Sequence, residues 1–280
     1  MSGWGANAAR RLGKGEAPVT VALAVAYGPL ARDLRAAQAI EVDYLEVAGP
    51  DADEAALTSG RPLLLHNSVF DWSLGHPAAL TQRDVLARTR HTLAITDAPW
   101  LSIHLGFSAA QVAFDSAMQA RSPVLARDEL LERICRNVRA LAQAIPVPLL
   151  LENLDYCPGG AYEHICAPDF IAAVIAETGA SLLLDLAHAQ VSAARLGLPI
   201  ADYLDRLPLE RVRQLHVSGP RRRDGVLTDA HEPLAEEDYS LLWRVLQGTR
   251  PRALTLEYGR DAAALCEQIV RLRPMLEREA

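Results

Sequence analysis

The sequence predicts an α/β fold, a single (β/α)8 or TIM barrel, and three observations support this prediction. Eight short apolar runs recur along the 280 residues, and most gaps between them show helical periodicity. The runs are nearly continuously apolar, as expected of parallel strands buried on both faces. No linker or change in composition divides the chain, and α/β barrels routinely use about 250 residues for one domain.

The expected strands follow one another in a regular order. They are 19–25, 44–49, 62–68, 100–106, 148–154, 181–188, 212–219 and 253–259. The clearest helix is 128–145, in which one stripe is formed by Leu130, Leu131, Ile134, Val138, Leu141 and Ile145. The first gaps are short, so their helices must be brief. The longest irregular pieces are expected after strand ends, at 66–80, 106–125, 155–168 and 219–238.

A doubly wound open sheet is the alternative fold. Such a sheet commonly carries a glycine-rich phosphate loop after its first strand. Here the first strand is followed by Ala26-Tyr27-Gly28-Pro29, which is a poor match to that loop. The barrel is therefore preferred.

Composition and charge exclude several classes of protein. Half of the residues are hydrophobic, which excludes a disordered chain, and the net charge of -7 makes nucleic acid an unlikely partner. No apolar run approaches the roughly 20 residues that span a membrane. Residues 1–17 lack the apolar core of a signal peptide and are expected to form a flexible lead to a catalytic barrel over 18–280. Four cysteines without a CxxC pair indicate reduced thiols in the cytoplasm.

Ionisable side chains end most of the expected strands, and in a barrel those ends meet at one mouth. Nine imidazoles and carboxylates form the candidate set, from which Glu46 at the end of the second strand is left out. The set is His66, His104, Glu152, Asp185, His188, His216, Asp229, His231 and Glu257. These groups are ligands for zinc, iron or manganese. Nine of them could hold about three ions if one or two carboxylates bridge.

Local spacing supports a shared centre. Asp185 and His188 are three residues apart where a strand turns into a helix, so both can face one point. Asp229 and His231 are two apart, which in extended chain puts both side chains on one side. A metal-free acid–base pair of Glu152 and Asp185 is the alternative, but the five accompanying histidines favour metal.

Other polar residues receive simpler interpretations. Three histidines, His76, His91 and His164, are expected in loops or on helix surfaces. Cys157 and Cys166 are interpreted as free loop cysteines, with a redox or substrate-contacting role as the alternative. The run Arg221–Arg223 is interpreted as a solvated turn, with a carboxylate or phosphate site as the alternative. No GxSxG elbow supports a serine nucleophile.

From the third strand onward the sequence resembles the multinuclear non-haem iron-dependent oxidative enzymes, the family of the methanobactin biosynthesis enzyme. The resemblance covers about two hundred residues, and the order of its motifs is specific. The matching pieces are His66-Asn67-Ser68, Ser73-Leu74-Gly75, 101–105, 150–154, 182–185, 207–209, 214–216, 229–234 and Leu256-Glu257. The nine-ligand pattern is also similar to the trinuclear-zinc apurinic endonucleases and, more loosely, to the xylose isomerase-like barrels.

This resemblance implies three metal positions. His66, His104 and Glu152 would hold the first ion. Glu152 would bridge to a second ion held by Asp185, His216 and Glu257. The third would be held by His188, Asp229 and His231. The iron-enzyme family commonly carries Asn where this sequence has His188.

The resemblance also implies an activity. It is the dioxygen-dependent oxidation of a residue, cysteine above all, in a ribosomally made precursor peptide. Two or three iron ions would be the cofactor, Glu152, Asp185 and His216 the catalytic centre, and a partner protein would present the peptide.

Three other functions remain as alternatives. A zinc or manganese hydrolase or phosphodiesterase would use the same ligands to activate water. A sugar isomerase would want a lysine or histidine acid/base beside the metals, and Lys14 is the only lysine of the sequence. A degenerate barrel acting as a scaffold would be expected to have lost some of the nine ligands.

Overall fold

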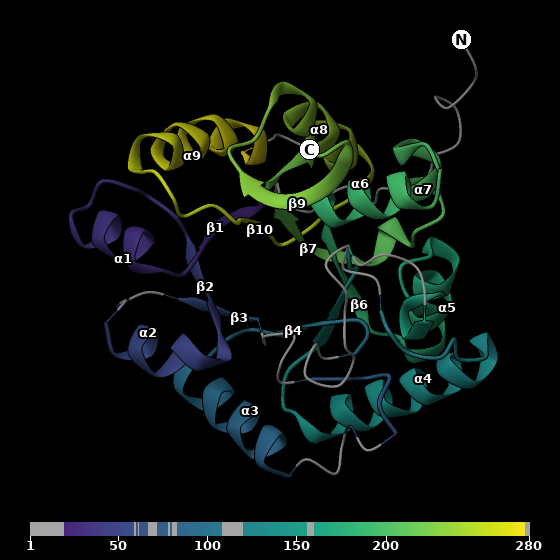
Figure 1. The fold of residues 1–280 in the computed structure, drawn as a ribbon. Coiled ribbons are helices and arrows are strands. Elements are labelled where there is room, and N and C mark those ends of the chain that lie inside the picture. The colour runs from purple at the N-terminus through teal and green to yellow at the C-terminus, as the bar shows by residue number, and fades with distance from the viewer. Residues whose placement is uncertain are drawn as a thin grey trace, which may run out of the picture.

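The computed structural model describes residues 20–58, 60, 62–66, 72–77, 79, 83–107, 120–155 and 160–277. Within these ranges, parallel strands close into a barrel in the order β1-β10-β7-β6-β5-β4-β3-β2 (Figure 1). The barrel strands are β1 (Ala22–Ala26), β2 (Tyr44–Ala48), β3 (Leu63–His66), β4 (Leu101–His104), β5 (Leu149–Glu152), β6 (Ser181–Asp185), β7 (Val212–Val217) and β10 (Ala253–Leu256). The predicted TIM barrel is confirmed, and the open sheet is excluded because β1 pairs with β10.

Helices surround this barrel (Figure 1). They are α1 (Pro29–Ala36), α2 (Ala52–Thr58), α3 (Arg83–Thr96), α4 (Arg127–Ala144), α5 (Pro168–Thr178), α6 (Leu186–Arg195), α7 (Ile200–Asp205), α8 (Glu236–Gly248) and α9 (Ala262–Leu276), with short 3-10 helices η1 (Gly49–Asp51), η3 (Gly160–Tyr162) and η4 (Leu209–Arg211). The expected helix 128–145 is α4, and the residues of its predicted stripe are buried except Leu131, which is half-buried. Helix α5 begins at a proline and is followed by Gly179, whose φ of 71° suits the left-handed position after a helix.

The segment 219–238, expected to be irregular, contains a β-hairpin. Strand β8 (Gly219–Arg223) pairs antiparallel with β9 (Val226–Glu232). The two residues between them, Asp224 and Gly225, have φ values of 50° and 80°, which fits a type I′ turn. The hairpin contacts α6, and it carries Asp229 and His231 on β9.

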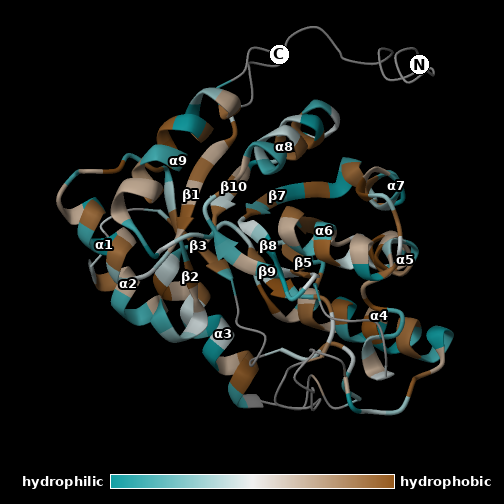
Figure 2. Ribbon diagram, turned by 45° about the horizontal axis from the view of Figure 1, so that its top comes forward, coloured by the Kyte–Doolittle hydropathy of each residue, from teal (hydrophilic) through white to brown (hydrophobic). Residues whose placement is uncertain are grey.

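Successive side chains of the barrel strands point alternately into two apolar layers, one inside the barrel and one beneath the helices. Leu64, Trp100, Leu150 and Leu183 belong to a small cluster inside the barrel, whereas the residues between them pack toward the helices. Figure 2 shows mostly hydrophobic strands and helices that carry both hydrophobic and hydrophilic residues. Because side chains alternate along a strand, the residue two positions after each inner residue also points into the barrel. This alternation directs the polar strand ends into the mouth.

Two expectations fall on parts of the chain that the structure does not describe. The lead over residues 1–17 and the loop residue Cys157 both lie outside the described ranges. A membrane helix was not expected, and within those ranges the structure has no helix that is long and apolar enough to cross a bilayer.

Candidate metal centre

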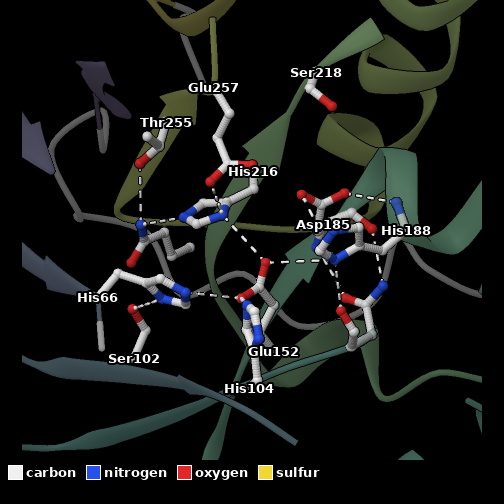
Figure 3. A network of polar contacts seen from close by, with 12 residues as sticks. His66, Ser102, His104, Glu152, Asp185, His188, His216, Ser218, Thr255 and Glu257 are labelled. Carbon is white, nitrogen blue, oxygen red and sulfur yellow. Dashed lines mark hydrogen bonds and ion pairs between the residues drawn. The ribbon is translucent and has the colours of Figure 1, made fainter. Parts of the chain in front are cut away.

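The nine predicted residues gather at the carboxyl ends of the strands (Figure 3 shows seven of them). Strands β3 to β6 end at His66, His104, Glu152 and Asp185, and His216 is the last residue but one of β7. Glu257 follows β10, and His188 lies in the first turn of α6. Asp229 and His231 reach the site from the hairpin strand β9. Segments that are up to 191 residues apart in sequence therefore supply one cluster.

The first group joins two histidines to one carboxylate. Glu152 Oε2 lies 3.3 Å from His66 Nε2 and 3.0 Å from His104 Nε2. The Nδ1 atom of His66 is 2.9 Å from the hydroxyl of Ser102, which itself donates to the carbonyl of Leu65. The hydroxyl oxygen therefore accepts from Nδ1–H, and the lone pair of His66 is left on Nε2, facing the carboxylate.

The second group contains Asp185, His216 and Glu257, and it also touches Glu152. His216 Nδ1 lies 3.2 Å from Glu257 Oε1 and 3.3 Å from Glu152 Oε1. Asp185 caps α6, because its Oδ1 accepts from the backbone N–H of His188 at 2.7 Å. Glu152 thus contacts both groups, as expected of a shared ligand.

The third group is completed by the hairpin. Asp229 Oδ2 lies 3.6 Å from His188 Nε2 and 2.6 Å from His231 Nε2. Its other oxygen accepts from the Ser218 hydroxyl at 2.9 Å. His188 Nδ1 is 2.9 Å from the Asn153 carbonyl, so Nδ1 carries the hydrogen and Nε2 is free toward Asp229.

Three sets of side chains have ligand atoms within 4.8 Å of one another and could each hold a metal ion. They are His66 with His104 and Glu152, Glu152 with Asp185 and His188, and Asp185 with His216 and Glu257. The first and last agree with the positions that the resemblance implies. The middle set differs, because it joins His188 to Glu152 and Asp185. His188 lies between the second and third groups, since its Nδ1 is also 3.6 Å from Glu152 Oε1.

Unsatisfied polar atoms show that the cluster fits a cation. Within the described ranges, Glu152 Oε2, Asp185 Oδ2 and His216 Nδ1 are buried and make no hydrogen bond. A buried polar atom in this condition costs about 1–3 kcal/mol, and more if it is charged. All three belong to the sets that could hold a metal ion. Ions bound in these sets would satisfy all three atoms.

The two central carboxyl groups differ in their electrostatics. Burial opposes the charged form of Glu152, but His104 and His66 outweigh it and hold its pKa well below the usual range. Burial raises the pKa of Asp185 to about 7, although His188 opposes the rise. Asp185 therefore lacks a sufficient positive neighbour among the side chains. A divalent cation would provide one.

The direction in which the pKa of each histidine shifts depends on the carboxylates near it. Burial lowers the pKa of His66. Burial also opposes the charged form of His216, but its carboxylate neighbours, Glu46 foremost, raise its pKa well above the ordinary value. The hydrogen bond to Asp229 raises the pKa of His231 to about 9. The negative charge of the site thus lies around its second and third groups.

Several residues that support the ligands are not among the nine predicted residues. Glu46 is buried and contacts His216, and Gln214 and Thr255 contact Glu46. Asn153 exchanges two hydrogen bonds with the backbone of Asp185, each of 2.9 Å. The available signal was a polar residue within a strand otherwise rich in apolar residues, such as Glu46 between Leu45 and Val47. Such residues occupy the inner face of the barrel beneath the ligands.

Cys166 and the arginine run are not part of the three sets that could hold a metal ion. Burial raises the pKa of the Cys166 thiol to about 12, which fits an unreactive cysteine. The arginine run is not a turn, because it forms part of β8. Arg221 lies 3.7 Å from Asp238 and Arg223 lies 3.8 Å from Glu232. These pairings leave less positive charge for a substrate anion.

Fold and site together define a class: a TIM barrel with a histidine–carboxylate centre at its mouth that could hold metal ions. Solved structures of this architecture are similar over nearly the whole chain. Endonuclease IV from Thermus thermophilus has a TM-score of 0.59 at 20% identity, covering 91% of this chain and 99% of that one. A xylose isomerase-like TIM barrel protein from Mycobacterium smegmatis has a TM-score of 0.59 at 14% identity, covering 92% and 96%. At these identities the likeness concerns the fold alone.

The sequence comparison identifies the family. Residues 35–273 match the family model described as RiPP precursor modification enzyme MbnB/TglH/ChrH, and the chain belongs to this family. A UPF0276 protein from Paraburkholderia phytofirmans is 31% identical over 210 residues, which is 73% of this chain and 66% of that relative. The chain thus spans about two thirds of the length of that relative. The expected family and the expected TIM-barrel fold are both confirmed.

Proposed function

We propose that this protein uses two or three bound iron ions and dioxygen to oxidise a residue, cysteine above all, of a ribosomally made precursor peptide. The observation that carries the proposal is the buried cluster in which Glu152 touches four imidazoles. The family match supports a precursor peptide as the substrate. Imidazoles and carboxylates suit iron, zinc and manganese, so the donor set supports iron without selecting it.

The chain's own residues have distinct parts in this proposal. Glu152 would join the first and second metal positions, because each of its oxygens faces a different group. Asp185 and His216 would complete the second position with Glu257. Asp229 and His231 would complete a third with His188. When bound, iron would supply the redox chemistry through which dioxygen oxidises the peptide.

The third group, which the hairpin completes, is more exposed to solvent than the rest of the cluster. His231 is 45% exposed, whereas the Glu152 side chain is 1% exposed. The open side of the cluster therefore lies toward β9, and we assign the approach of the peptide to this side. A partner protein that presents the peptide belongs to the proposal, as the resemblance implies.

A trinuclear zinc or manganese hydrolase is the second candidate, and His188 favours it. The Nε2 atom of His188 faces Asp229, so the third group has two imidazoles and one carboxylate. This combination is a common one for zinc. A clustered zinc centre would lower the pKa of a bound water and so promote hydrolysis.

Metal analysis after anaerobic purification, combined with Mössbauer spectroscopy, tests the two candidates. The proposal expects two or three irons per chain and oxygen consumption that requires the precursor peptide. The substrate for this test is sought as a short cysteine-containing peptide encoded beside the gene. Three tightly held zinc ions with phosphodiesterase activity, and no peptide-dependent oxygen consumption, would overturn the proposal in favour of the hydrolase.

A further inference from the structure

A buried polar network lies directly beneath the metal centre. It consists of Glu46 on β2, Gln214 on β7, Thr255 on β10 and Trp100, which precedes β4. All four side chains are at most 5% exposed. A buried carboxylate is costly unless it is fully hydrogen-bonded, so the contacts of Glu46 determine what this network can do.

The indole of Trp100 sets the orientation of the network. Its Nε1–H can only donate, and it lies 2.7 Å from Gln214 Oε1. The amide nitrogen of Gln214 must therefore face the other way, where it donates to Glu46 Oε2 at 2.6 Å. The Thr255 hydroxyl donates to the same oxygen. One oxygen of Glu46 is thus occupied by two donors.

The other oxygen of Glu46 faces a ligand of the metal centre. Glu46 Oε1 lies 2.8 Å from His216 Nε2. At this distance from a carboxylate oxygen, Nε2 must carry a hydrogen, because two lone pairs would repel. The amide nitrogen of Gln214 also lies 3.1 Å from Nε2, but this longer contact joins two donors and does not compete. The lone pair of neutral His216 is therefore on Nδ1.

The Nδ1 atom points into the second group. It lies 3.2 Å from Glu257 Oε1 and 3.3 Å from Glu152 Oε1. A lone pair between two carboxylates is unfavourable unless a cation lies among them. His66 and His188 are held instead by a hydroxyl and by a backbone carbonyl. Within the described ranges, His216 is thus the metal-centre histidine whose outer nitrogen faces a carboxylate of the barrel interior.

We propose that Glu46 is a positioning residue that holds the hydrogen of His216 on Nε2 and thereby presents Nδ1 to the metal. The inference rests on the proposed function in one respect, that the second group binds a metal ion. Hydrogen bonding of a ligand histidine to a carboxylate fixes its tautomer and raises its basicity. Glu46 would therefore strengthen this metal position from inside the barrel without touching the ion.

Glu46→Gln tests the inference, because an amide can keep only one of the two hydrogen-bonding faces. The donors of Gln214 and Thr255 require its oxygen, so its NH2 group would face His216 Nε2. His216 would then move its hydrogen to Nδ1 and lose the metal-facing lone pair. We expect affinity for zinc at the second group to fall by about 10- to 100-fold, as is typical for such partners. The first group, His66 with His104 and Glu152, should keep wild-type affinity.

A double variant provides a rescue that a merely structural role would not show. In Glu46→Gln with Gln214→Glu, the new carboxylate accepts from Trp100 and from the amide of residue 46. The amide oxygen then faces His216 Nε2 and accepts its hydrogen again. We expect the double variant to recover most of the lost zinc affinity. Glu54→Gln, on the exposed face of α2, is the matched control and should bind zinc as the wild type does.

The readouts are zinc titration by calorimetry and the ring 15N shifts of His216 in zinc-loaded and metal-free protein. Zinc is used because it is diamagnetic. The spectrum of the wild type tests the inference even if a variant fails to fold. The inference expects Nε2 protonated and Nδ1 bound to zinc. A zinc-loaded wild type with the hydrogen of His216 on Nδ1 would overturn it, as would Glu46→Gln with unchanged shifts and zinc affinity.

The two proposals fail in different ways. If the wild type binds no metal, the proposed function and the metal part of the inference fail together. If the wild type binds metal and oxidises its peptide while Glu46→Gln binds equally well, only the inference fails.

Discussion

Replacing Glu152 by glutamine changes the centre at its most connected point. The side chain is 1% exposed, and its two oxygens lie 3.0 to 3.6 Å from His66, His104, His188 and His216. Glutamine preserves the shape and removes the charge. Because both the first and second groups use this carboxylate, we expect two metal ions to be lost together rather than one.

The metal-free protein should also lose stability. Although burial opposes their charged forms, neighbouring carboxylates raise the pKa of His188 and the pKa of His216, so Glu152 is a buried carboxylate that faces two rings biased toward the charged form. Removing one member of a buried ion pair costs about 3–5 kcal/mol. One kcal/mol shifts the melting temperature of a chain of roughly this size by about 2–4 °C. The expected fall is therefore about 10 °C.

Metal content by mass spectrometry and thermal unfolding of the metal-free protein measure the two effects. Glu152→Asp keeps the negative charge on a shorter side chain. We expect it to keep most of the wild-type melting temperature but to lose most of the bound metal. Glu54→Gln again serves as the control for an exposed carboxylate. Loss of a single ion would refute a shared ligand. An unchanged melting temperature would refute the charge coupling.

Three further substitutions test the packing that positions the site, each by thermal or denaturant unfolding. A Cβ on Gly75 would lie 2.4 to 2.8 Å from ring atoms of Phe107, so Gly75→Ala should destabilise by about 1–3 kcal/mol, and no loss would show that the ring moves freely. Trp100→Phe leaves the Gln214 carbonyl without its donor and should cost about 1–3 kcal/mol; a neutral effect would contradict the orientation assigned to that amide. Asp261→Ala removes the N-cap of α9 and should cost about 1 kcal/mol, whereas Asp261→Asn should be nearly neutral.

The strands and the mouth could be predicted because short apolar runs and their polar ends are local features. Leu150 and Glu152 are two residues apart, so they lie on the same inner face whatever the rest of the barrel does. The same rule places Leu64 with His66 and Leu183 with Asp185. Closure of the barrel was harder to predict from the sequence, because it depends on the pairing of β1 with β10 across 231 residues.

The hairpin was missed for a physical reason. A run of three arginines has little preference for a strand, and only the Asp224-Gly225 turn pointed to one. The pairing of β8 with β9 and the contact with α6 impose the strand conformation. As a result, Asp229 and His231 are held by a defined arm rather than by an irregular loop.

The sequence by itself determined which side chains end at the mouth, because strand alternation and the parallel order of strand ends are set by spacing along the chain. Only the tertiary structure decided which atoms of those side chains face one another. Glu46 shows the difference: its partner His216 is 170 residues away, on a strand that is not its neighbour in the barrel. Contacts across a barrel depend on how the strands close, and no local pattern records that.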